Sequence, residues 1–198
     1  MINLAAQIIS IIFHPAVLSV VTPALLIIYI PRDVPYSLYW IFYPLFFVVV
    51  VTVFTLYGIK MKLFSDFDVT KRKERGPFYA FVIILTVIYI SLLLLLNGPK
   101  SLVILGMGVL IGAIILEVIN KRLKASVHVA AAAAFMCTLA LLFGGLFLLL
   151  PILIPIVAWS RIHMNRHTLS EAVIGGIIGT SITLILFLVI EYILYLYG

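Results

Sequence analysis

The chain has 198 residues, of which 65% are hydrophobic and only 10% are charged, with 13 Lys and Arg against 7 Asp and Glu. A soluble domain is closer to half apolar and a quarter charged, and a disordered chain has low hydrophobicity, so both classes are excluded. The apolar residues form long runs rather than the strict alternation of an outer-membrane barrel. The composition therefore predicts an all-α, polytopic transmembrane helical bundle that forms one integral membrane domain over residues 1–198.

Seven apolar segments are candidate spans, because a helix needs about 20 apolar residues to cross a bilayer. They are expected near residues 7–30, 38–59, 78–96, 101–119, 127–143, 146–160 and 169–197. The first has no basic region before it and no small-residue cleavage site, so it is interpreted as a retained span rather than a signal peptide. Gly144 and Gly145 separate the fifth from the sixth and favour a tight hairpin there. The expected number of spans is six to seven.

The charged residues gather in the loops that follow the even-numbered spans. All but two of the 13 basic residues lie in these loops, and only Arg32 and Lys100 fall on the other side. Alternate loops of a spanning chain lie on the same side of the membrane, so the polar chemistry converges on one face. The excess of Lys and Arg favours the cytoplasm for this face, in a multi-pass protein of the cell membrane.

Three polar clusters in these loops are candidates for chemistry, and they span residues 66–77, 124–128 and 160–171. In the third cluster, Ser160 and Arg161 are adjacent, His167 follows six residues after the arginine, and Glu171 follows four residues after the histidine. A carboxylate four residues from an imidazole can reach it on one helical turn. It can then fix the tautomer of that imidazole through one ring nitrogen.

These residue types suit the hydrolysis of a phosphate ester. Such a reaction needs positive charge on the phosphate oxygens, a nucleophile, and a proton for the leaving oxygen. A neutral imidazole at His167 can attack phosphorus, and His128 can protonate the departing alkoxide. Cations or hydroxyl donors for the phosphate are available at Arg161, Arg75, Lys71 or Arg72, and Ser126. This chemistry requires no metal and no cofactor.

The three clusters resemble the motifs of the type 2 phosphatidic acid phosphatase (PAP2) superfamily, which read KxxxxxxRP, PSGH and SRxxxxxHxxxD in that order. The third motif is the specific one, and Glu171 stands in place of its aspartate. The second keeps Ser126 and His128, but Ala125 and Val127 replace its proline and glycine.

The first motif is loose in this chain. If Arg75 is its arginine, Asp68 occupies the lysine position, and Lys71 or Arg72 must substitute. Gly76 also separates Arg75 from Pro77. The resemblance therefore covers roughly residue 60 to the end of the chain, with its most specific part in the third cluster.

The resemblance implies a metal-independent hydrolase in which His167 forms a phosphohistidine, Glu171 orients it, and His128 is the general acid. The substrate is expected to be a lipid phosphate or diphosphate monoester that enters sideways from the bilayer, so the expected partners are lipids and no nucleic acid. The alternative is a catalytically inactive PAP2-like protein that binds or transports anionic lipids. Val127 and the irregular first motif favour that alternative.

Two further interpretations concern the third cluster. Thr168 and Glu171 fit a capping box at the start of a helix. His163, His167 and Glu171 recur every four residues, so one continuous helix would align them as a metal-binding stripe. A helix start at Thr168 would break that stripe. His163 is therefore a candidate for supporting the residues that bind the phosphate rather than for binding it directly. Asp68 is a second candidate of this kind.

Overall fold

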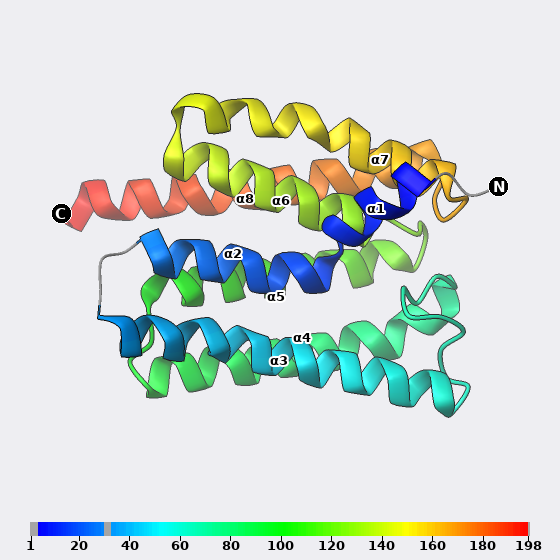
Figure 1. The fold of residues 1–198 in the computed structure, drawn as a ribbon, viewed down its shortest axis with the longest axis horizontal. Coiled ribbons are helices and arrows are strands. Elements are labelled where there is room, and N and C mark those ends of the chain that lie inside the picture. The colour runs from blue at the N-terminus through cyan, green and yellow to red at the C-terminus, as the bar shows by residue number, and fades with distance from the viewer. Residues whose placement is uncertain (1–3, 30–32, 198) are drawn as a thin grey trace. The chain divides into compact units, whose positions relative to one another are not determined.

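The computed structural model describes residues 4–29 and 33–197, which contain helices and no strand (Figure 1). The elements, in chain order, are α1 (Leu4–Ile12), α2 (Pro15–Tyr29), α3 (Val34–Lys60), η1 (Arg72–Glu74), α4 (Arg75–Leu95), α5 (Lys100–Asn120), α6 (Val127–Phe143), η2 (Gly145–Leu153), α7 (Ile154–His163) and α8 (Leu169–Tyr197). The all-α, polytopic fold expected from the sequence is confirmed. Ile30, which ends the first expected span, and Arg32 lie outside the described residues.

Most of the helices are long and apolar enough to cross a bilayer. In the described part of the chain these are α3, α4 with η1, α5, η2 with α7, and α8. The bent pair α1 and α2 counts as a sixth span if taken together, and α6 is a shorter apolar helix of 17 residues. That length is at the lower limit for a crossing, about 17 residues. Six to seven spans are therefore consistent with the helices.

The first expected span, residues 7–30, is not one helix. It is broken into α1 and α2, which are bent by 47° at a break of two residues. Pro15 is the first residue of α2; its ring removes a backbone N–H donor and disfavours helical geometry at His14 before it. Pro23 lies inside α2 without ending it. The span expected near these residues therefore consists of two helices separated by Phe13 and His14.

The chain divides into two compact units. The first unit comprises Met1–Leu18 and Leu123–Gly198, and the second comprises Ser19–Arg122. In the first unit α6 packs against α8, and α7 packs against both α1 and α8. Gly175 and Gly179 of α8 face the backbone of α6, where a Cβ atom would overlap the carbonyl oxygens of Ser126 and Ala130. These glycines permit the close approach of two helices that small-residue stripes favour.

The hairpin expected at Gly144 and Gly145 is present. Both glycines have positive φ angles, 60° and 53°, which suit residues without a Cβ atom. The chain then returns as the 3₁₀ helix η2, with 9 residues, and as α7, with 10 residues. A 3₁₀ helix rises about 2.0 Å per residue and an α-helix about 1.5 Å, so together they extend roughly 33 Å. A short segment can thus cover a ~30 Å hydrocarbon core.

The core of the second unit is aromatic. Its buried residues are Ile27, Trp40, Phe47, Tyr89, Ile90, Leu93 and Leu102. Phe54 and Phe81 stack with ring centroids 3.7 Å apart, and the Tyr43 hydroxyl donates to the Tyr89 carbonyl at 2.8 Å. Large rings with one polar atom each can fill an apolar interior and still satisfy their hydroxyl groups.

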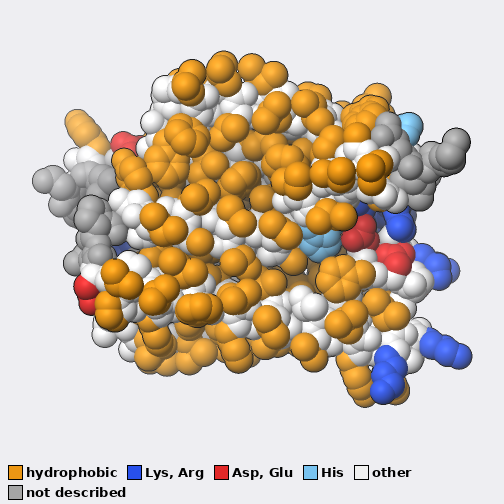
Figure 2. Space-filling view, viewed as in Figure 1, with side chains coloured by type: hydrophobic (Ala, Val, Ile, Leu, Met, Phe, Trp, Pro, Cys, Tyr) orange, Lys and Arg blue, Asp and Glu red, His pale blue; other side chains and the backbone are white. Residues whose placement is uncertain are grey.

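The outer surfaces of the helices are apolar. Figure 2 shows hydrophobic side chains over the helix walls, with Lys and Arg side chains at helix ends. Large apolar side chains such as Phe42, Phe46, Leu188 and Tyr192 are 59–64% exposed. Such exposure is unfavourable in water and favourable in lipid. The surface thus agrees with the membrane location inferred from composition.

Candidate active site

The third polar cluster folds as the end of α7 followed by the beginning of α8. Asn165 adopts a left-handed conformation with a φ of 55°. Its N–H donates to the Ile162 carbonyl at 2.9 Å, and the Arg166 N–H donates to the Arg161 carbonyl at 3.0 Å. This pair of bonds is a Schellman motif, which closes the C-terminus of a helix. α8 begins two residues after His167. The end of α7 and the beginning of α8 therefore together set the six-residue spacing from Arg161 to His167.

Glu171 serves His167 and the start of α8 with the same carboxylate oxygen. Its Oε2 lies 2.9 Å from His167 Nδ1 and accepts the Thr168 N–H at 3.2 Å, while Thr168 Oγ1 accepts the Glu171 N–H at 3.4 Å. The capping box expected from the sequence is therefore present together with the contact to histidine. When Nδ1 of a neutral imidazole donates to a carboxylate, the lone pair of the ring lies on Nε2.

The second polar cluster is joined directly to the third. The backbone N–H of Ser126 donates to the Glu171 carbonyl at 3.0 Å, and Lys124 Nζ donates to the Arg166 carbonyl at 2.7 Å. Ser126 is also the N-cap of α6, since its Oγ accepts the Val129 N–H. These bonds place the start of α6 beside the start of α8. His128 and His167, 5% and 8% exposed, are therefore carried on adjoining helix ends.

Val127, which replaces a glycine of the family motif, is the first helical residue of α6. The neighbouring His128 is in the second position of that helix. Helical backbone accommodates any ordinary side chain, so this position does not require glycine here. The substitution leaves both Ser126 and His128 in a regular helix start.

Arg161 and Ser160 lie near the C-terminal end of α7 and are almost completely buried, at 2% and 0% exposure. Both side chains bond to α1: Ser160 Oγ donates to the Ala6 carbonyl at 2.6 Å, and Arg161 Nη1 donates to Ser10 Oγ. A buried guanidinium is costly unless its donors have partners. The sequence analysis did not include Ser10, which is 151 residues away in the chain.

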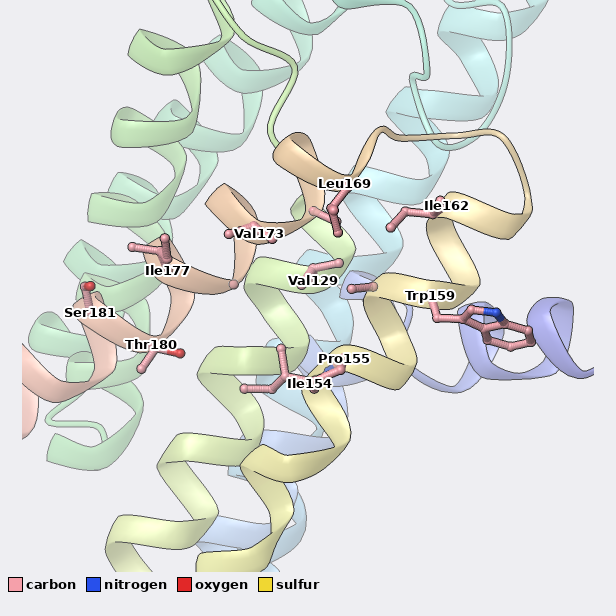
Figure 3. Close-up of a pocket in the computed structure, with 13 residues that line it drawn as sticks. Val129, Ile154, Pro155, Trp159, Ile162, Leu169, Val173, Ile177, Thr180 and Ser181 are labelled. Atoms are coloured by element: carbon pink, nitrogen blue, oxygen red, sulfur yellow. The ribbon is translucent and has the colours of Figure 1, made fainter.

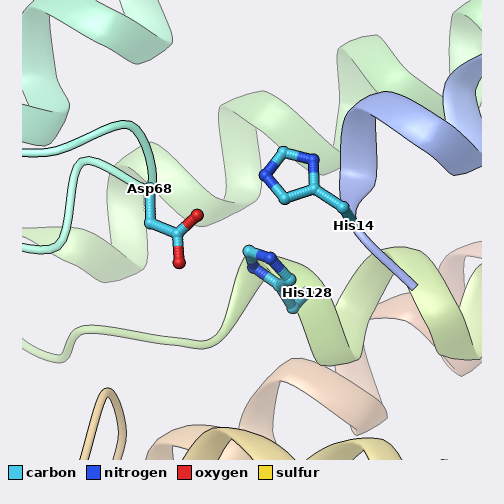
Figure 4. A group of neighbouring side chains, drawn as sticks. All are labelled: His14, Asp68 and His128. Carbon is cyan, nitrogen blue, oxygen red and sulfur yellow. The ribbon is translucent and has the colours of Figure 1, made fainter. Parts of the chain in front are cut away.

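His14 lies at the break between α1 and α2 and contacts His128 (Figure 4). The two rings meet edge to face, with centroids 4.8 Å apart and an interplanar angle of 89°. The sequence analysis had named no partner for His14. The only local signal was a histidine before a proline, and this signal does not identify a contact 114 residues further along the chain.

His163 does not align with His167. α7 ends at His163 and α8 begins at Leu169, so the continuous helix needed for a stripe with Glu171 is absent from this described segment. The His163 side chain is exposed and stacks on Trp159, with centroids 5.2 Å apart. The metal-stripe interpretation therefore lacks its geometric basis.

The first polar cluster lies in the second unit. Arg75 is 4% exposed and its Nε donates to the Val69 carbonyl at 3.0 Å. Arg72 donates from both Nη atoms to the Lys121 and Arg122 carbonyls, at 2.7 and 3.0 Å, and thereby caps α5. Lys71, whose side chain is 68% exposed, pairs with Glu74 at 3.4 Å.

Asp68 is half-buried in the same loop. Each candidate cation of this motif already has a partner: Arg72 and Arg75 bond to backbone carbonyl groups, and Lys71 pairs with Glu74. Their part in phosphate binding, and that of Asp68 near the phosphate, stay predictions.

A groove of about 560 Å³ runs along the first unit between α7 and α8, with Val129 of α6 in its lining (Figure 3). Along α8 it is lined from Leu169 to Ser181 at helical spacing, and along α7 from Ile154 to Ile162. Ala158, Ala172 and Gly176 contribute small side chains or none. Figure 3 shows Leu169 and Ile162 together at one end of the groove. That end adjoins His167, two residues before Leu169.

Residues 120–195 match the model of the PAP2 superfamily, a phosphatase-type family. The described helices had already defined a polytopic membrane protein, and the match identifies a PAP2 domain in its C-terminal part. The resemblance inferred from the sequence is confirmed over this range, which contains the second and third clusters. No curated protein and no solved structure matches the chain.

Proposed function

We propose that the protein is an integral membrane phosphatase that hydrolyses a lipid phosphate or diphosphate monoester through a phosphohistidine at His167. The observation that carries this proposal is the double use of Glu171. Its carboxylate bonds to His167, and its carbonyl accepts the N–H of Ser126 in the cluster that contains His128. One residue thus links the proposed nucleophile to the cluster of the proposed acid.

In the first step, His167 Nε2 attacks phosphorus while the ester bond to the leaving oxygen breaks. The electron pair of that bond goes to the leaving oxygen, and protonated His128 supplies its proton. Glu171 stabilises the positive imidazole ring that forms when His167 is phosphorylated. In the second step, water attacks the phosphohistidine and His128 takes the proton, which restores both residues.

Arg161 and Ser126 are the proposed phosphate contacts within the first unit. A guanidinium can donate two parallel hydrogen bonds to phosphate oxygens, and a serine hydroxyl can donate one. Both side chains belong to segments that end beside His167. The proposal needs no metal, because the charge of the phosphate is balanced by these donors.

The groove between α7 and α8 supports a substrate with an apolar chain. Its α8 lining runs from Leu169 to Thr180, which is roughly 17 Å at 1.5 Å per residue. One leaflet of a ~30 Å hydrocarbon core has about the same depth. A lipid with its phosphate near His167 has room there for a chain directed toward the middle of the bilayer.

We place the protein in the cell membrane with this site on the cytoplasmic face, on the charge distribution of its loops. A single cysteine introduced at the exposed Ser170, in a Cys137→Ser background, tests the orientation. A membrane-impermeant maleimide should label it only after the cells are opened. Labelling of intact cells would reverse the assignment.

The function is tested by phosphate release from phosphatidate, phosphatidylglycerol phosphate and prenyl diphosphates, with purified protein in detergent. At least one substrate should be hydrolysed, with the rate unchanged by chelator. A radiolabelled substrate should leave an acid-labile, alkali-stable label on the protein, as expected for phosphohistidine.

Two outcomes would count against the proposal. Loss of activity with chelator, restored by a divalent cation, would favour a metal enzyme. Binding of several lipid phosphates without turnover would favour the lipid-binding or lipid-transport alternative.

A further inference from the structure

Two polar residues of the N-terminal helix pair contact the candidate site: Ser10 of α1 bonds to Arg161 of α7, and His14, before α2, packs against His128 of α6. The bend of 47° between α1 and α2 follows from the break at His14 and Pro15. Ser10 lies on α1 just before this break, and His14 lies within it. Both precede the PAP2 match at residues 120–195, so the family match assigns no role to either residue.

Two buried hydrogen bonds join α1 to α7. Ala6 and Ser10 are one turn apart on α1, and they bond to the neighbouring residues Ser160 and Arg161. Ser10 is 5% exposed, Arg161 is 2% exposed, and Ala6 and Ser160 are fully buried. Ala6 leaves space for α7 to approach. A guanidinium held at Nη1 has a restricted plane, and bidentate binding of phosphate depends on that plane.

The contact with α6 involves the ring of His14. Its Nδ1 accepts the N–H of Ala16 at 3.2 Å, so the side chain caps the start of α2 and the neutral ring carries its proton on Nε2. The same ring packs edge to face against His128 (Figure 4). A ring fixed by a backbone N–H therefore restricts the rotation of the proposed general acid.

We infer that α1 and the break after it are a positioning device for the phosphate site: Ser10 orients the guanidinium of Arg161, and His14 orients the ring of His128. This inference rests on the proposed function for its kinetic readout. The hydrogen bond from Arg161 to Ser10 can be tested by binding alone. Neither Ser10 nor His14 needs to touch the substrate.

Binding of inorganic phosphate to the purified protein tests Ser10. Ser10→Ala should weaken phosphate binding about 10-fold, because a hydrogen bond that holds a charged donor contributes more than one between neutral groups. Ser10→Thr, which keeps the hydroxyl, should restore most of the affinity. Ser91→Ala is the matched control, because Ser91 bonds to the Val87 carbonyl of its own helix in the second unit.

A double-mutant cycle separates positioning from folding. In an Arg161→Ala background, Ser10→Ala should have no further effect on phosphate affinity, because its effect passes through the guanidinium. An equal loss of affinity in both backgrounds would overturn the role of Ser10. A lowered Tm with unchanged phosphate affinity would overturn it as well, since the bond would then be structural only.

The role of His14 is tested by two variants that each keep one of its properties. His14→Asn keeps an acceptor for the Ala16 N–H, and His14→Phe keeps a ring beside His128. If the ring positions the acid, kcat should fall about 10-fold in the asparagine variant, which is less than the roughly 10²–10⁴-fold contribution of the acid itself, and it should fall less in the phenylalanine variant, with KM little changed. The reverse order would mean that capping of α2 is what matters.

The outcomes also distinguish this inference from the proposed function. Phosphate binding that weakens with Ser10→Ala, in a protein that releases no phosphate from any lipid, would leave the positioning role of Ser10 standing and reject the enzyme. A protein that releases phosphate from a lipid, but whose phosphate affinity is unaffected by Ser10→Ala, would support the enzyme and overturn the positioning role of Ser10. A parent protein that binds no inorganic phosphate would overturn the positioning role of Ser10, while the phosphate-release screen would still decide whether the protein is an enzyme.

Discussion

The two units differ in how buried hydroxyl groups inside their helices are satisfied, although buried Arg75 and Asn120 of the second unit also bond to other segments. In the second unit, Thr55 and Thr86 donate to carbonyl groups of their own helices, four residues back. In the first unit, Ser160 and Arg161 bond to α1, and His167 bonds to Glu171 across the start of α8. Hydrogen bonds within a helix do not depend on its neighbours, whereas bonds between elements fix their relative positions.

The bonds between α1 and α7 show which buried polar residues depend on helix packing for their partners. Buried polar groups that link elements are costly to assemble, because each must find its partner when the helices pack. Six buried polar residues of the first unit are described, and of these Ser10, Ser160 and Arg161 bond between α1 and α7; the six are Ser10, Ser126, His128, Ser160, Arg161 and His167. The most informative substitutions therefore compare a polar residue that bonds between elements with one that bonds within its own helix.

The largest effect is expected for His167→Ala. Loss of the proposed nucleophile should lower kcat by at least about 10³-fold, since covalent catalysis has no substitute at this position. Phosphate release and the yield of labelled phosphoenzyme measure it. His163→Ala is the control, because that exposed ring packs on Trp159 and lies outside the contact between His167 and Glu171. Equal activity of the His167 variant and the parent would refute the assigned nucleophile.

Glu171→Gln should be slow but active. The amide can still accept the Thr168 N–H, but it cannot offset the positive charge that develops on His167. We expect kcat to fall about 10²-fold with little change in KM, within the usual range for acid–base assistance. Glu171→Ala should in addition lower the Tm, because it removes the capping box. If the glutamine variant kept full kcat, Glu171 would be a cap and nothing more.

Gly179→Ala should destabilise the protein without acting on the chemistry directly. A Cβ atom there overlaps the Ala130 carbonyl, so α6 and α8 must separate at a cost of about 1–3 kcal/mol. A drop in Tm of about 2–12 °C measures this. Gly76→Ala in the second unit is the control, because its Cβ would lie 3.8 Å from Glu117 Oε1, an ordinary contact. Similar Tm values for both variants would contradict the close packing of α6 on α8.

The smallest effect is expected for Thr86→Val. The hydroxyl bonds only within its own helix, at 2.7 Å, and valine has nearly the same shape. The free energy of unfolding should change by less than about 0.5 kcal/mol. Ser160→Ala in the first unit should cost more, about 1–2 kcal/mol, because it leaves the Ala6 carbonyl without that donor. Denaturant titration of both variants would show whether bonds between elements matter more.

The features that the sequence predicted well are those with local signals. Runs of apolar residues predicted the helices, two adjacent glycines predicted the turn after α6, and the Thr168 to Glu171 pattern predicted the start of α8. The proline at position 15 was also a local signal, but the break of the first span before it was not predicted.

The long-range links had no periodic signal to reveal them. The bond between the Glu171 carbonyl and the Ser126 N–H depends on how α6 packs against α8, because backbone groups are common to all residues. The bond between Ser10 and Arg161 depends on where a broken helix turns back. A serine in an apolar helix most often bonds to its own backbone, as Ser91 does, so its side chain gave no reason to single it out.

The Schellman turn at Asn165 has a consequence for how this segment can vary. Asn165 tolerates a left-handed conformation better than most residues, and the bond from Arg166 to Arg161 closes only if the loop keeps its length. One residue added or removed here would break the bond between the Arg166 N–H and the Arg161 carbonyl and would shift His167 relative to the end of α7. We therefore expect insertions and deletions at this junction to disturb the proposed site more than substitutions at its exposed positions do.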